Sequence, residues 1–459
     1  MKRMGENMKI IIIGNGKVGF AIAKQLSHEG YEITIVENKP QVLNLTMNVL
    51  DVVGVYGNGC NYDVLKEANV EQADLVIAAT SSDEVNIISC LLAKKMGADH
   101  TIARIRNPEY VRGLRMLKED LGLSMQINPE QTAAREIVRS LSFANSIKVS
   151  SFAKGRMELA EIKIHEGNPL CNQTIYQIDS ALKSQVQFVA IQRDGEAIIP
   201  DGRTILLKND KVTLTATAKQ LEKFLCETGI IEHRAIHEIM IIGGGKITFY
   251  LAPMLMEMGI AVKVIEIKRE RCEELVERFP LLTVIHGDGT DHELLLSENL
   301  EEMDAFIALT DNDEENVITS MYASSHGVPR VLPKVNRIAL GFLLEKLGLE
   351  NTITPKNLTA NQIVQYVRAM QNTLGSSVES LTKIVDDQVE VLEFRVRENC
   401  RFINQPLKDI KFKKGILLSN ILRKGKATIA SGNSTVSLGD TVIIISQLHG
   451  LREINDVLA

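Results

Sequence analysis

The sequence contains no tryptophan, and aromatic residues make up only 4% of its 459 positions. Hydrophobic residues nevertheless account for 45% of the chain, an ordinary share for a globular protein. The core must therefore be built mainly from aliphatic side chains, which suits buried parallel strands rich in valine and isoleucine. A chain of this length is expected to form about three or four domains.

Signals for several other protein classes are also missing. The six cysteines stand singly and form no C-x-x-C pair, which favours reduced, buried thiols over disulfides or a metal site. No apolar run approaches the roughly 18 residues that cross a bilayer. The segment Met1–Met8 lacks the apolar stretch of a signal peptide. The net charge is −6 and no basic stripe is present, so we expect no nucleic-acid partner and a cytoplasmic protein.

The first half of the sequence is repeated in the second half. Gly14 and Glu37 reappear 229 positions later as Gly243 and Glu266. Further along the chain the offset stays at 230 for the pairs Gly57 and Gly287, Asp74 and Asp304, Thr80 and Thr310, Asp83 and Asp313, Asn86 and Asn316, Gly202 and Gly432, and Asp210 and Asp440. Chance does not keep such a register, so each half is one copy of a repeated unit.

Each copy begins with alternating strand and helix patterns. Short apolar runs predict strands at 10–13, 31–36, 52–56, 75–79 and 101–105 in the first copy, and at 239–242, 261–265, 283–286, 305–309 and 330–334 in the second. Helical patterns separate most of these runs, which predicts a doubly wound parallel sheet of the Rossmann type. Helices at 131–144 and 358–373 should follow, opening at Pro129 and Pro355.

The end of each copy changes to a two-residue period. Polar and apolar residues alternate along Leu159–Ile164 and Val391–Val396, and turn-forming dipeptides such as Asp201-Gly202 follow. The fold class is therefore α/β, with two Rossmann-like domains that are each followed by a small α+β domain. The expected Rossmann-like domains are 1–144 and 233–374, and the expected small domains are 145–232 and 375–459.

The first copy carries a glycine turn of the G-x-G-x-x-G type between a strand and a helix, Gly14-Asn15-Gly16-Lys17-Val18-Gly19. Such a turn lets a pyrophosphate approach the backbone at the N-terminus of the helix. Glu37 ends the next strand, where a carboxylate accepts ribose hydroxyls and repels a 2′-phosphate. These residues predict binding of NAD(H) or an adenine nucleotide rather than NADP(H). The alternative is that the glycines serve only a tight turn.

The second copy departs from this pattern. Its turn reads Gly243-Gly244-Gly245-Lys246-Ile247-Thr248, so a threonine stands in place of the third glycine. Thr248 should hold the helix slightly off the sheet, and Pro253 should kink that helix. Glu266 is retained. We therefore expect the first cleft to bind nucleotide more tightly and leave binding at the second open.

Polar residues follow the fourth and fifth strands of each copy. Ligands of open α/β sheets lie at the carboxyl ends of strands, so we expect these residues to line the two clefts. They are Thr80, Ser81 and Arg104 in the first copy, and Thr310, Asp311 and Lys334 in the second. The alternatives are helix N-capping for the hydroxyl and acidic residues, and a solvated or ion-paired role for the two cations.

The segment His286–His292 contains histidines and aspartates that invite a metal interpretation. The corresponding segment of the first copy, 56–62, has none of them, so a metal site shared by both copies is excluded. A turn that places Asp288 near an adenine is the better interpretation.

Taken together, these residues resemble a known family. The first glycine turn, Glu37, Ala73-Asp74, 82–86 and 102–108 resemble an RCK (KTN) domain, and 168–170, 199–202 and 209–210 resemble its companion C-terminal domain. Two such pairs cover nearly the whole chain. The resemblance implies a cytosolic regulatory subunit that forms a ring beneath a TrkH-like membrane potassium transporter, at the inner face of the cell membrane. It also implies a homo-oligomer, a tetramer of this duplicated chain, that binds NAD(H) or ATP/ADP.

On the family's pattern, nucleotide contacts fall on the candidate residues of both copies. They are Gly14, Asn15, Gly16, Lys17, Val18, Glu37, Thr80, Ser81 and Arg104 in the first copy, and Gly243, Gly244, Gly245, Lys246, Ile247, Glu266, Thr310, Asp311 and Lys334 in the second.

The competing interpretation is an NAD-dependent dehydrogenase with duplicated Rossmann domains. Hydride transfer needs a proton donor or acceptor near the nicotinamide, and usually a substrate domain that is not itself repeated. Each copy instead pairs its cleft with a small domain that has no obvious acid–base pair, metal set or nucleophile. We therefore expect a nucleotide sensor without enzymatic activity.

Overall fold

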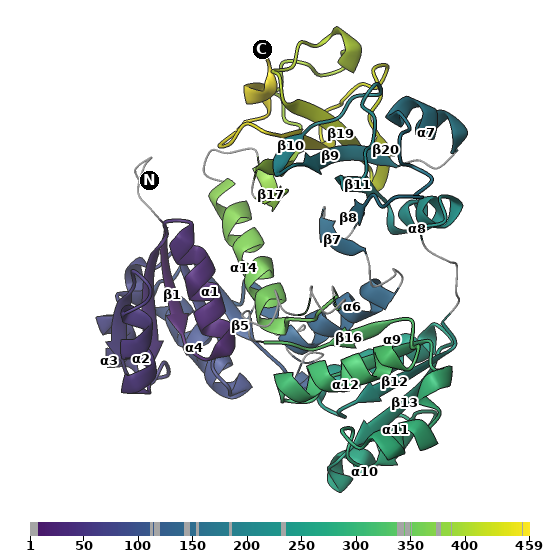
Figure 1. Cartoon of the computed structure of the whole chain (residues 1–459). Coiled ribbons are helices and arrows are strands. Elements are labelled where there is room, and N and C mark those ends of the chain that lie inside the picture. The colour runs from purple at the N-terminus through teal and green to yellow at the C-terminus, as the bar shows by residue number, and fades with distance from the viewer. Residues whose placement is uncertain are drawn as a thin grey trace.

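The computed structural model describes residues 8–110, 113, 120–141, 147–152, 156–182, 186–230, 236–336, 344, 349, 351–372, 378–386, 388–451 and 453–459. The expected domain boundaries after residues 144, 232 and 374 fall outside these ranges. Within these ranges the strands form two parallel and two antiparallel sheets (Figure 1). The two parallel sheets belong to separate lobes, and the antiparallel sheets lie together above them in the view of Figure 1.

The first lobe is the parallel sheet of residues 9–127 with its helices. Its strands are β1 Lys9–Ile13, β2 Glu32–Glu37, β3 Val53–Tyr56, β4 Leu75–Ala78, β5 His100–Arg104 and β6 Met125–Ile127, in the order β3-β2-β1-β4-β5-β6. Its helices are α1 Lys17–His28, α2 Pro40–Met47, α3 Tyr62–Glu67, the 3-10 turn η1 Val70–Gln72 and α4 Asp83–Met96. This is the predicted doubly wound arrangement, with β6 as an additional edge strand.

The second lobe, residues 238–353, repeats that arrangement. Its strands are β12 Glu238–Ile242, β13 Ala261–Glu266, β14 Thr283–His286, β15 Ala305–Ala308 and β16 Val331–Pro333, in the order β14-β13-β12-β15-β16. Its helices are α9 Lys246–Glu257, α10 Arg269–Arg278, α11 His292–Ser297, η3 Leu300–Glu302 and α12 Asp313–Ser325. A parallel bridge between Lys334 and Ile353 extends the edge of the sheet.

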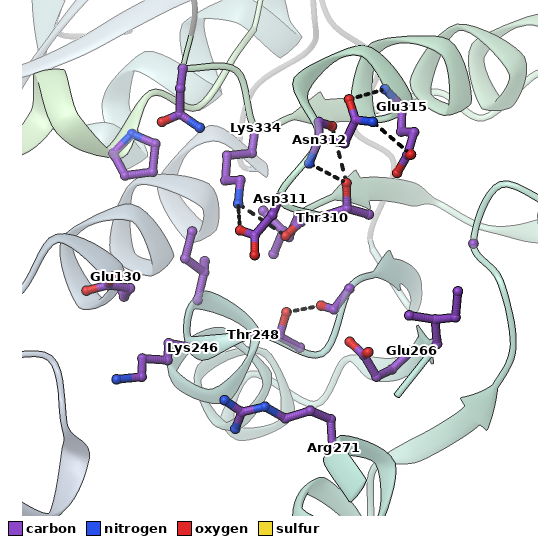
Figure 2. A pocket seen from close by; sticks show the side chains of 18 of the residues that line it. Glu130, Lys246, Thr248, Glu266, Arg271, Thr310, Asp311, Asn312, Glu315 and Lys334 are labelled. Carbon is purple, nitrogen blue, oxygen red and sulfur yellow. Dashed lines mark hydrogen bonds and ion pairs between the residues drawn. The ribbon is translucent and has the colours of Figure 1, made fainter. Parts of the chain in front are cut away.

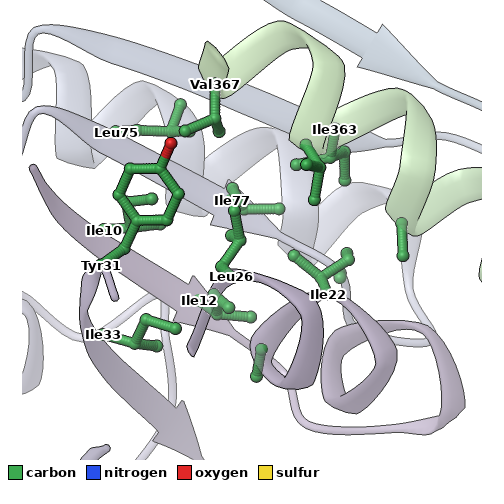
Figure 3. Packing of buried hydrophobic residues seen from close by; sticks show 14 of the residues in the cluster. Ile10, Ile12, Ile22, Leu26, Tyr31, Ile33, Leu75, Ile77, Ile363 and Val367 are labelled. Carbon is green, nitrogen blue, oxygen red and sulfur yellow. The ribbon is translucent and has the colours of Figure 1, made fainter. Parts of the chain in front are cut away.

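The helices that follow the two lobes are exchanged between them. Helix α14, Pro355–Asn372, comes after the second lobe in the sequence but packs on α1 of the first. Ile363 and Val367 of α14 are buried in one cluster with Ile22 and Leu26 of α1 (Figure 3). At the end of this contact, Arg368 forms an ion pair of 2.6 Å with Glu29. The core of the first lobe is therefore completed by a helix from the other half of the chain.

Helix α6, Pro129–Leu141, makes the reciprocal exchange. It follows the first lobe but packs on α9 of the second, where Ala133 and Ile137 are buried in one cluster with Leu251 and Leu255. The two exchanged helices also contact each other. The lobes are thus joined by buried apolar surface as well as by the chain.

The two antiparallel sheets pack face to face. The first contains β7 Lys148–Phe152, β8 Met157–Lys163, β9 Gln187–Arg193, β10 Glu196–Ile198 and β11 Lys211–Ala216, with helices α7 Ile175–Ala181 and α8 Ala218–Glu227. The second contains β17 Val378–Ile384, β18 Val389–Arg395, β19 Ile416–Arg423, β20 Lys426–Ile429 and β21 Thr441–Ser446, with 3-10 turns η5 Leu407–Asp409 and η6 Ile454–Val457. One buried cluster joins them and includes Leu159, Val189, Val391 and Ile443.

The sandwich buries both faces of the alternating strands. A two-residue period predicts one buried and one solvated face, but β8 and β18 are buried on both. The faces that carry Glu158 and Glu390 are covered as well, and these carboxylates are only 3% and 4% exposed. Both strands therefore lie inside the molecule.

Two further sequence expectations bear on the architecture. Within the described ranges, no helix is both long enough and apolar enough to cross a membrane. All six cysteines are free thiols, but only Cys90, Cys272 and Cys400 are buried, so the expectation of burial was wrong for the other three.

Candidate functional site

The two glycine turns use glycine for steric reasons. Gly14 and Gly243 have φ angles of 89° and 96°, a region that other residues rarely adopt. A Cβ atom on Gly14 would lie 2.8 Å from Thr80, which lies two residues after the adjacent strand β4. A Cβ atom on Gly19 would lie 2.0 Å from the carbonyl oxygen of Gly14. In the first lobe, helix α1 therefore approaches the turn as closely as the predicted pattern requires.

The second lobe accommodates its two departures from the pattern. Thr248 is fully buried, and its hydroxyl donates a hydrogen bond of 2.5 Å to the carbonyl oxygen of Gly243. Gly16 and Gly245, which precede the two helices, have nearly the same backbone angles, φ −72° and ψ −168° against φ −76° and ψ −170°. Helix α9 continues through Pro253 without ending there. The second turn therefore has the same form as the first.

Glu37 and Glu266 hold the same position in both lobes. Each is 8% exposed and ends the strand next to its glycine turn. Glu37 accepts hydrogen bonds from the backbone amides of Asn15 (2.7 Å) and Lys39 (3.0 Å). Glu266 accepts the equivalent bonds from Gly244 (2.5 Å) and Lys268 (2.8 Å). A carboxylate has about four acceptor positions, so each can hold its turn and still accept ribose hydroxyls.

The threonines that follow β4 and β15 support the loops after these strands. The amide and hydroxyl of Thr80 both donate to Asn86, and those of Thr310 both donate to Asn316. The helix caps are formed two residues later, by Ser82 on α4 and Asn312 on α12. Capping by Thr80, Ser81, Thr310 or Asp311 themselves is therefore wrong, and Ser81 and Asp311 are exposed.

The two cations that end the fifth strands are both engaged. Arg104 donates to the carbonyl oxygen of Thr80 (3.1 Å) and lies 3.7 Å from the carboxylate of Glu130 on α6. Lys334 lies 3.3 Å from the carboxylate of Asp311. Burial lowers the pKa of Arg104, and its Nε is buried without a hydrogen-bond partner. Arg104 therefore has one donor that no group of the described residues uses.

A cavity of about 780 Å³, the shared chamber, lies at the carboxyl ends of the second lobe's strands and extends to the first lobe. Figure 2 shows Lys246, Thr248, Glu266, Arg271, Lys334 and Glu130 around it. The first lobe contributes Lys17, Val18, Arg104 and Arg106, and the exchanged helices contribute Pro129, Glu130, Pro355 and Lys356. A ligand in this chamber would touch both lobes.

The lining of the shared chamber is positively charged. Eight lysines and arginines line it against five acidic residues, although the whole chain carries a net charge of −6. Burial and the nearby charge of Arg106 lower the pKa of Lys246. Burial likewise lowers the pKa of Lys356. A bound phosphate would relieve this crowding of cations, so the chamber suits an anionic ligand.

The chamber gathers many of the predicted residues, but not all of them. Eleven of the candidates line it: Lys17, Val18, Arg104, Gly243, Gly245, Lys246, Ile247, Glu266, Thr310, Asp311 and Lys334. Seven do not: Gly14, Asn15, Gly16, Glu37, Thr80, Ser81 and Gly244. All but Gly244 belong to the first lobe, and Gly244 lies close to Leu275 and Glu266. That the first cleft binds more tightly stays a prediction.

The sequence did not reveal the contributions that cross between lobes. Arg106 pairs with Glu130 at 2.7 Å, and its carbonyl oxygen accepts a bond of 3.0 Å from the hydroxyl of Tyr250 on α9. Tyr250 also accepts a bond of 2.9 Å from the side chain of Asn128. The one available signal was the position of Glu130 and Lys356, directly after the prolines that open the exchanged helices.

The histidines near Asp288 have other contacts. Nε2 of His286 lies 3.1 Å from the carbonyl oxygen of Ile267, and the ring of His292 stacks on Tyr322 at 3.8 Å. In the part of the chain that the structure describes, no three histidine, cysteine or acidic side chains are grouped to hold a metal ion.

Comparison with known proteins identifies the repeated units. Residues 10–129 and 239–355 match the TrkA-N domain, and residues 159–226 and 391–459 match the TrkA-C domain. The chain is 32% identical over 458 residues to Trk system potassium uptake protein TrkA homolog 2 of Methanosarcina mazei, covering 97% of this chain and 99% of that protein. It is 32% identical over 454 residues to the TrkA protein of Halomonas elongata, covering 98% of each chain.

Solved structures share the fold at lower sequence identity. The GsuK RCK domain is 17% identical with a TM-score of 0.60, over 97% of this chain and 93% of that one. The GsuK channel bound to NAD is 17% identical with a TM-score of 0.61, over 97% of this chain and 78% of that one. With both domain types matched twice and relatives aligned over nearly their full length, the chain belongs to the family of Trk system potassium uptake proteins TrkA.

Proposed function

We propose that this protein is a cytoplasmic regulatory subunit that binds NAD(H) or adenine nucleotides and gates a membrane potassium transporter of the Trk type. The shared chamber is the observation that carries the proposal, because its cationic lining comes from both lobes. Family relatives are named as potassium uptake proteins, and structures of GsuK, which has the same fold, are described as bound to NAD and to ADP.

The residues present fit a dinucleotide or a nucleoside di- or triphosphate. Nothing lies within 4 Å of a Cβ atom built on Gly16 or Gly245, so phosphates have room to approach both helix N-termini. Arg104, Lys246 and Lys356 line the chamber and offer positive charge. Glu37 and Glu266 end the strands that pair with the strands before the glycine turns, where they can accept ribose hydroxyls.

A ligand in the shared chamber would work by favouring one angle between the lobes. Such a ligand can shift the equilibrium between two arrangements of the lobes only by the difference between its affinities for them. Moving a gate from 1:99 to 99:1 needs about 5.5 kcal/mol, whereas coupling at one site typically supplies about 1–3 kcal/mol. Several chambers acting together would supply the difference, which favours a ring of several chains.

We propose a tetramer for this ring. Ile88 on α4 and Ile318 on α12 occupy equivalent positions in the two lobes, and they are 48% and 59% exposed. Paired exposed isoleucines on equivalent helices favour contacts between copies of the chain. Light scattering should give four times the chain mass, and replacing both isoleucines by glutamate should lower it. A monomer in the unaltered protein would contradict the ring.

The function is tested by nucleotide-dependent capture of the membrane subunit, with potassium uptake measured in the same cells. The Trk-type membrane subunit should bind the unaltered chain, and uptake should change when NADH, ATP or ADP is exchanged. Gly245→Glu would place a carboxylate in the phosphate position and should weaken that response, and Gly16→Glu in addition should abolish it. Potassium uptake that does not change with nucleotide would contradict the proposal. So would uptake that still changes with nucleotide when Gly16→Glu and Gly245→Glu are both present.

A regulator is proposed here in preference to the dehydrogenase. Incubation with NAD and a panel of hydroxy and amino acids, followed at the absorbance band of NADH, separates the two. Steady NADH formation with any of these substrates would favour the enzyme.

A further inference from the structure

The loops that follow β3 and β14 lie beside the ribose positions. In the sheets, Glu37 pairs with Tyr56 and Glu266 pairs with His286, so the next residues along each edge strand are Gly57–Cys60 and Gly287–Thr290. If a ribose binds at Glu37 or Glu266, as the proposed function requires, its purine base reaches the neighbouring loop. The side chains of these loops then face the edge of the base.

Each loop is held by the side chain at its second position. Oδ1 of Asp288 accepts bonds from the amide (2.9 Å) and the hydroxyl (2.8 Å) of Thr290. Oδ1 of Asn58 accepts the equivalent bond from the amide of Cys60 (3.0 Å). One side-chain atom is therefore engaged in the same way in both lobes, which fixes the direction of the other.

The second atom differs between the lobes. It is the acceptor Oδ2 in Asp288 and the donor Nδ2 in Asn58, and no group among the described residues bonds to either. Both side chains are exposed, and Asp288 lines the shared chamber. The bonds from Thr290 lower the pKa of Asp288, so its carboxylate is charged at neutral pH. The two clefts thus present opposite hydrogen-bonding groups at the same place.

We propose that the two clefts select purine bases differently, with Asp288 admitting 6-amino and rejecting 6-oxo purines, and Asn58 admitting both. A carboxylate accepts a bond from the amino group of adenine, but it repels the carbonyl oxygen of hypoxanthine. The amide nitrogen of Asn58 can donate to O6 of hypoxanthine, or to N1 of adenine after a small shift of the base. Base discrimination then belongs to the second cleft, and the first tolerates a wider set of purine nucleotides.

The test is calorimetry with ATP and ITP, which differ at this edge of the base. Gly16→Glu closes the first cleft and Gly245→Glu closes the second, because each places a carboxylate where phosphates would bind. With only the second cleft open, ATP should bind at least about tenfold more tightly than ITP, since a hydrogen bond to a charged group is at stake. With only the first cleft open, the two nucleotides should bind within about threefold of each other.

Two substitutions that hardly change the size of the side chain exchange the carboxylate and the amide between the two loops. Asp288→Asn should reduce the ATP preference of the second cleft to within about threefold, and Asn58→Asp should raise that of the first to about tenfold. Both keep the Oδ1 atom that holds the loop, so both should fold. Should a closing substitution disturb folding, the same two exchanges in the otherwise unaltered chain must still lower and raise the overall ATP preference.

The outcomes separate this inference from the proposed function. ATP and ITP binding equally to the second cleft, or a preference that neither exchange alters, would overturn the selectivity alone. Failure of the unaltered chain to bind ATP, ITP or NADH would overturn the proposed function, and the selectivity with it.

Discussion

At the scale of single residues, Glu37 and Glu266 have a structural task besides the ribose contact predicted from the sequence. Each carboxylate accepts one backbone amide of its glycine turn and one amide from the segment that follows its own strand. The strand position and the glycine spacing predicted where these residues lie. Those hydrogen bonds could not be predicted, because they depend on the side-chain conformation in the folded lobe. Arg106 carried no signal in the sequence, and Glu130 carried only its position after Pro129, since both meet the second lobe only after folding.

Glu37→Gln should therefore destabilise the protein even without nucleotide. Both carboxylate oxygens accept from backbone amides, so a glutamine must turn its NH2 group toward one N–H donor. An unsatisfied buried donor costs about 1–3 kcal/mol. Urea unfolding of the nucleotide-free protein measures the loss. Glu67→Gln, at an exposed position on α3, is the matched control and should be neutral. Equal urea midpoints of unfolding for the two variants would show that Glu37 does not stabilise the nucleotide-free fold.

Glu158 provides a second test at this scale. It lies 3.1 Å from Arg139 of α6, and Arg139 also contacts Glu136. Burial raises the pKa of Glu158 to about 7; Arg139 opposes the rise and Glu136 adds to it. The folded state therefore favours the protonated acid. That stabilisation is complete below the unfolded pKa of about 4.3 and is lost as the pH rises to about 7.

The measurement is the stability of the unaltered protein relative to Glu158→Gln as a function of pH. Because glutamine does not titrate, the difference isolates this one group. The unaltered protein should lose on the order of 3 kcal/mol relative to the variant between pH 4.5 and 7.5. A difference that is flat across this range would show that Glu158 is not held in a desolvated position.

At the scale of secondary-structure elements, the strands of both lobes could be predicted closely and the exchanged helices could not. Parallel strands buried on both faces give continuous apolar runs, so β1 and β12 were expected within one residue of their observed ends. The apolar faces of α6 and α14 predict burial, but an amphipathic pattern does not indicate which helix will cover that face. β6 is only three residues long and has too few positions to show a period.

Because the helices are exchanged, a destabilising substitution in one half of the chain should weaken the lobe formed by the other half. Ile363→Ala leaves a cavity beside Ile22 and Leu26, so it should weaken the first lobe by about 2–5 kcal/mol. Hydrogen exchange should quicken in α1 more than in α9. The reciprocal variant Ile137→Ala should quicken exchange in α9 more than in α1. If each variant loosened only the lobe that precedes it in the sequence, the exchanged packing would be contradicted.

At the scale of the whole molecule, duplication places two similar lobes around a chamber that neither could form alone. The exchanged helices fasten the lobes to each other, and their first turns line the chamber with Glu130 and Lys356. A ligand that neutralises the cations of both lobes should therefore favour a closer arrangement of the two. The sequence predicted two clefts, but the shared chamber arises only from the way the lobes face each other.

The most direct test of this account is small-angle scattering of the unaltered protein with and without NADH, ATP and ADP, beside Gly16→Glu/Gly245→Glu. Calorimetry on the same samples should first establish that the unaltered chain binds nucleotide. At least one bound nucleotide should then change the scattering profile of the unaltered protein, and none should change that of the doubly substituted protein. Nucleotide binding that leaves the profile of the unaltered protein the same would contradict a chamber that senses the angle between the lobes.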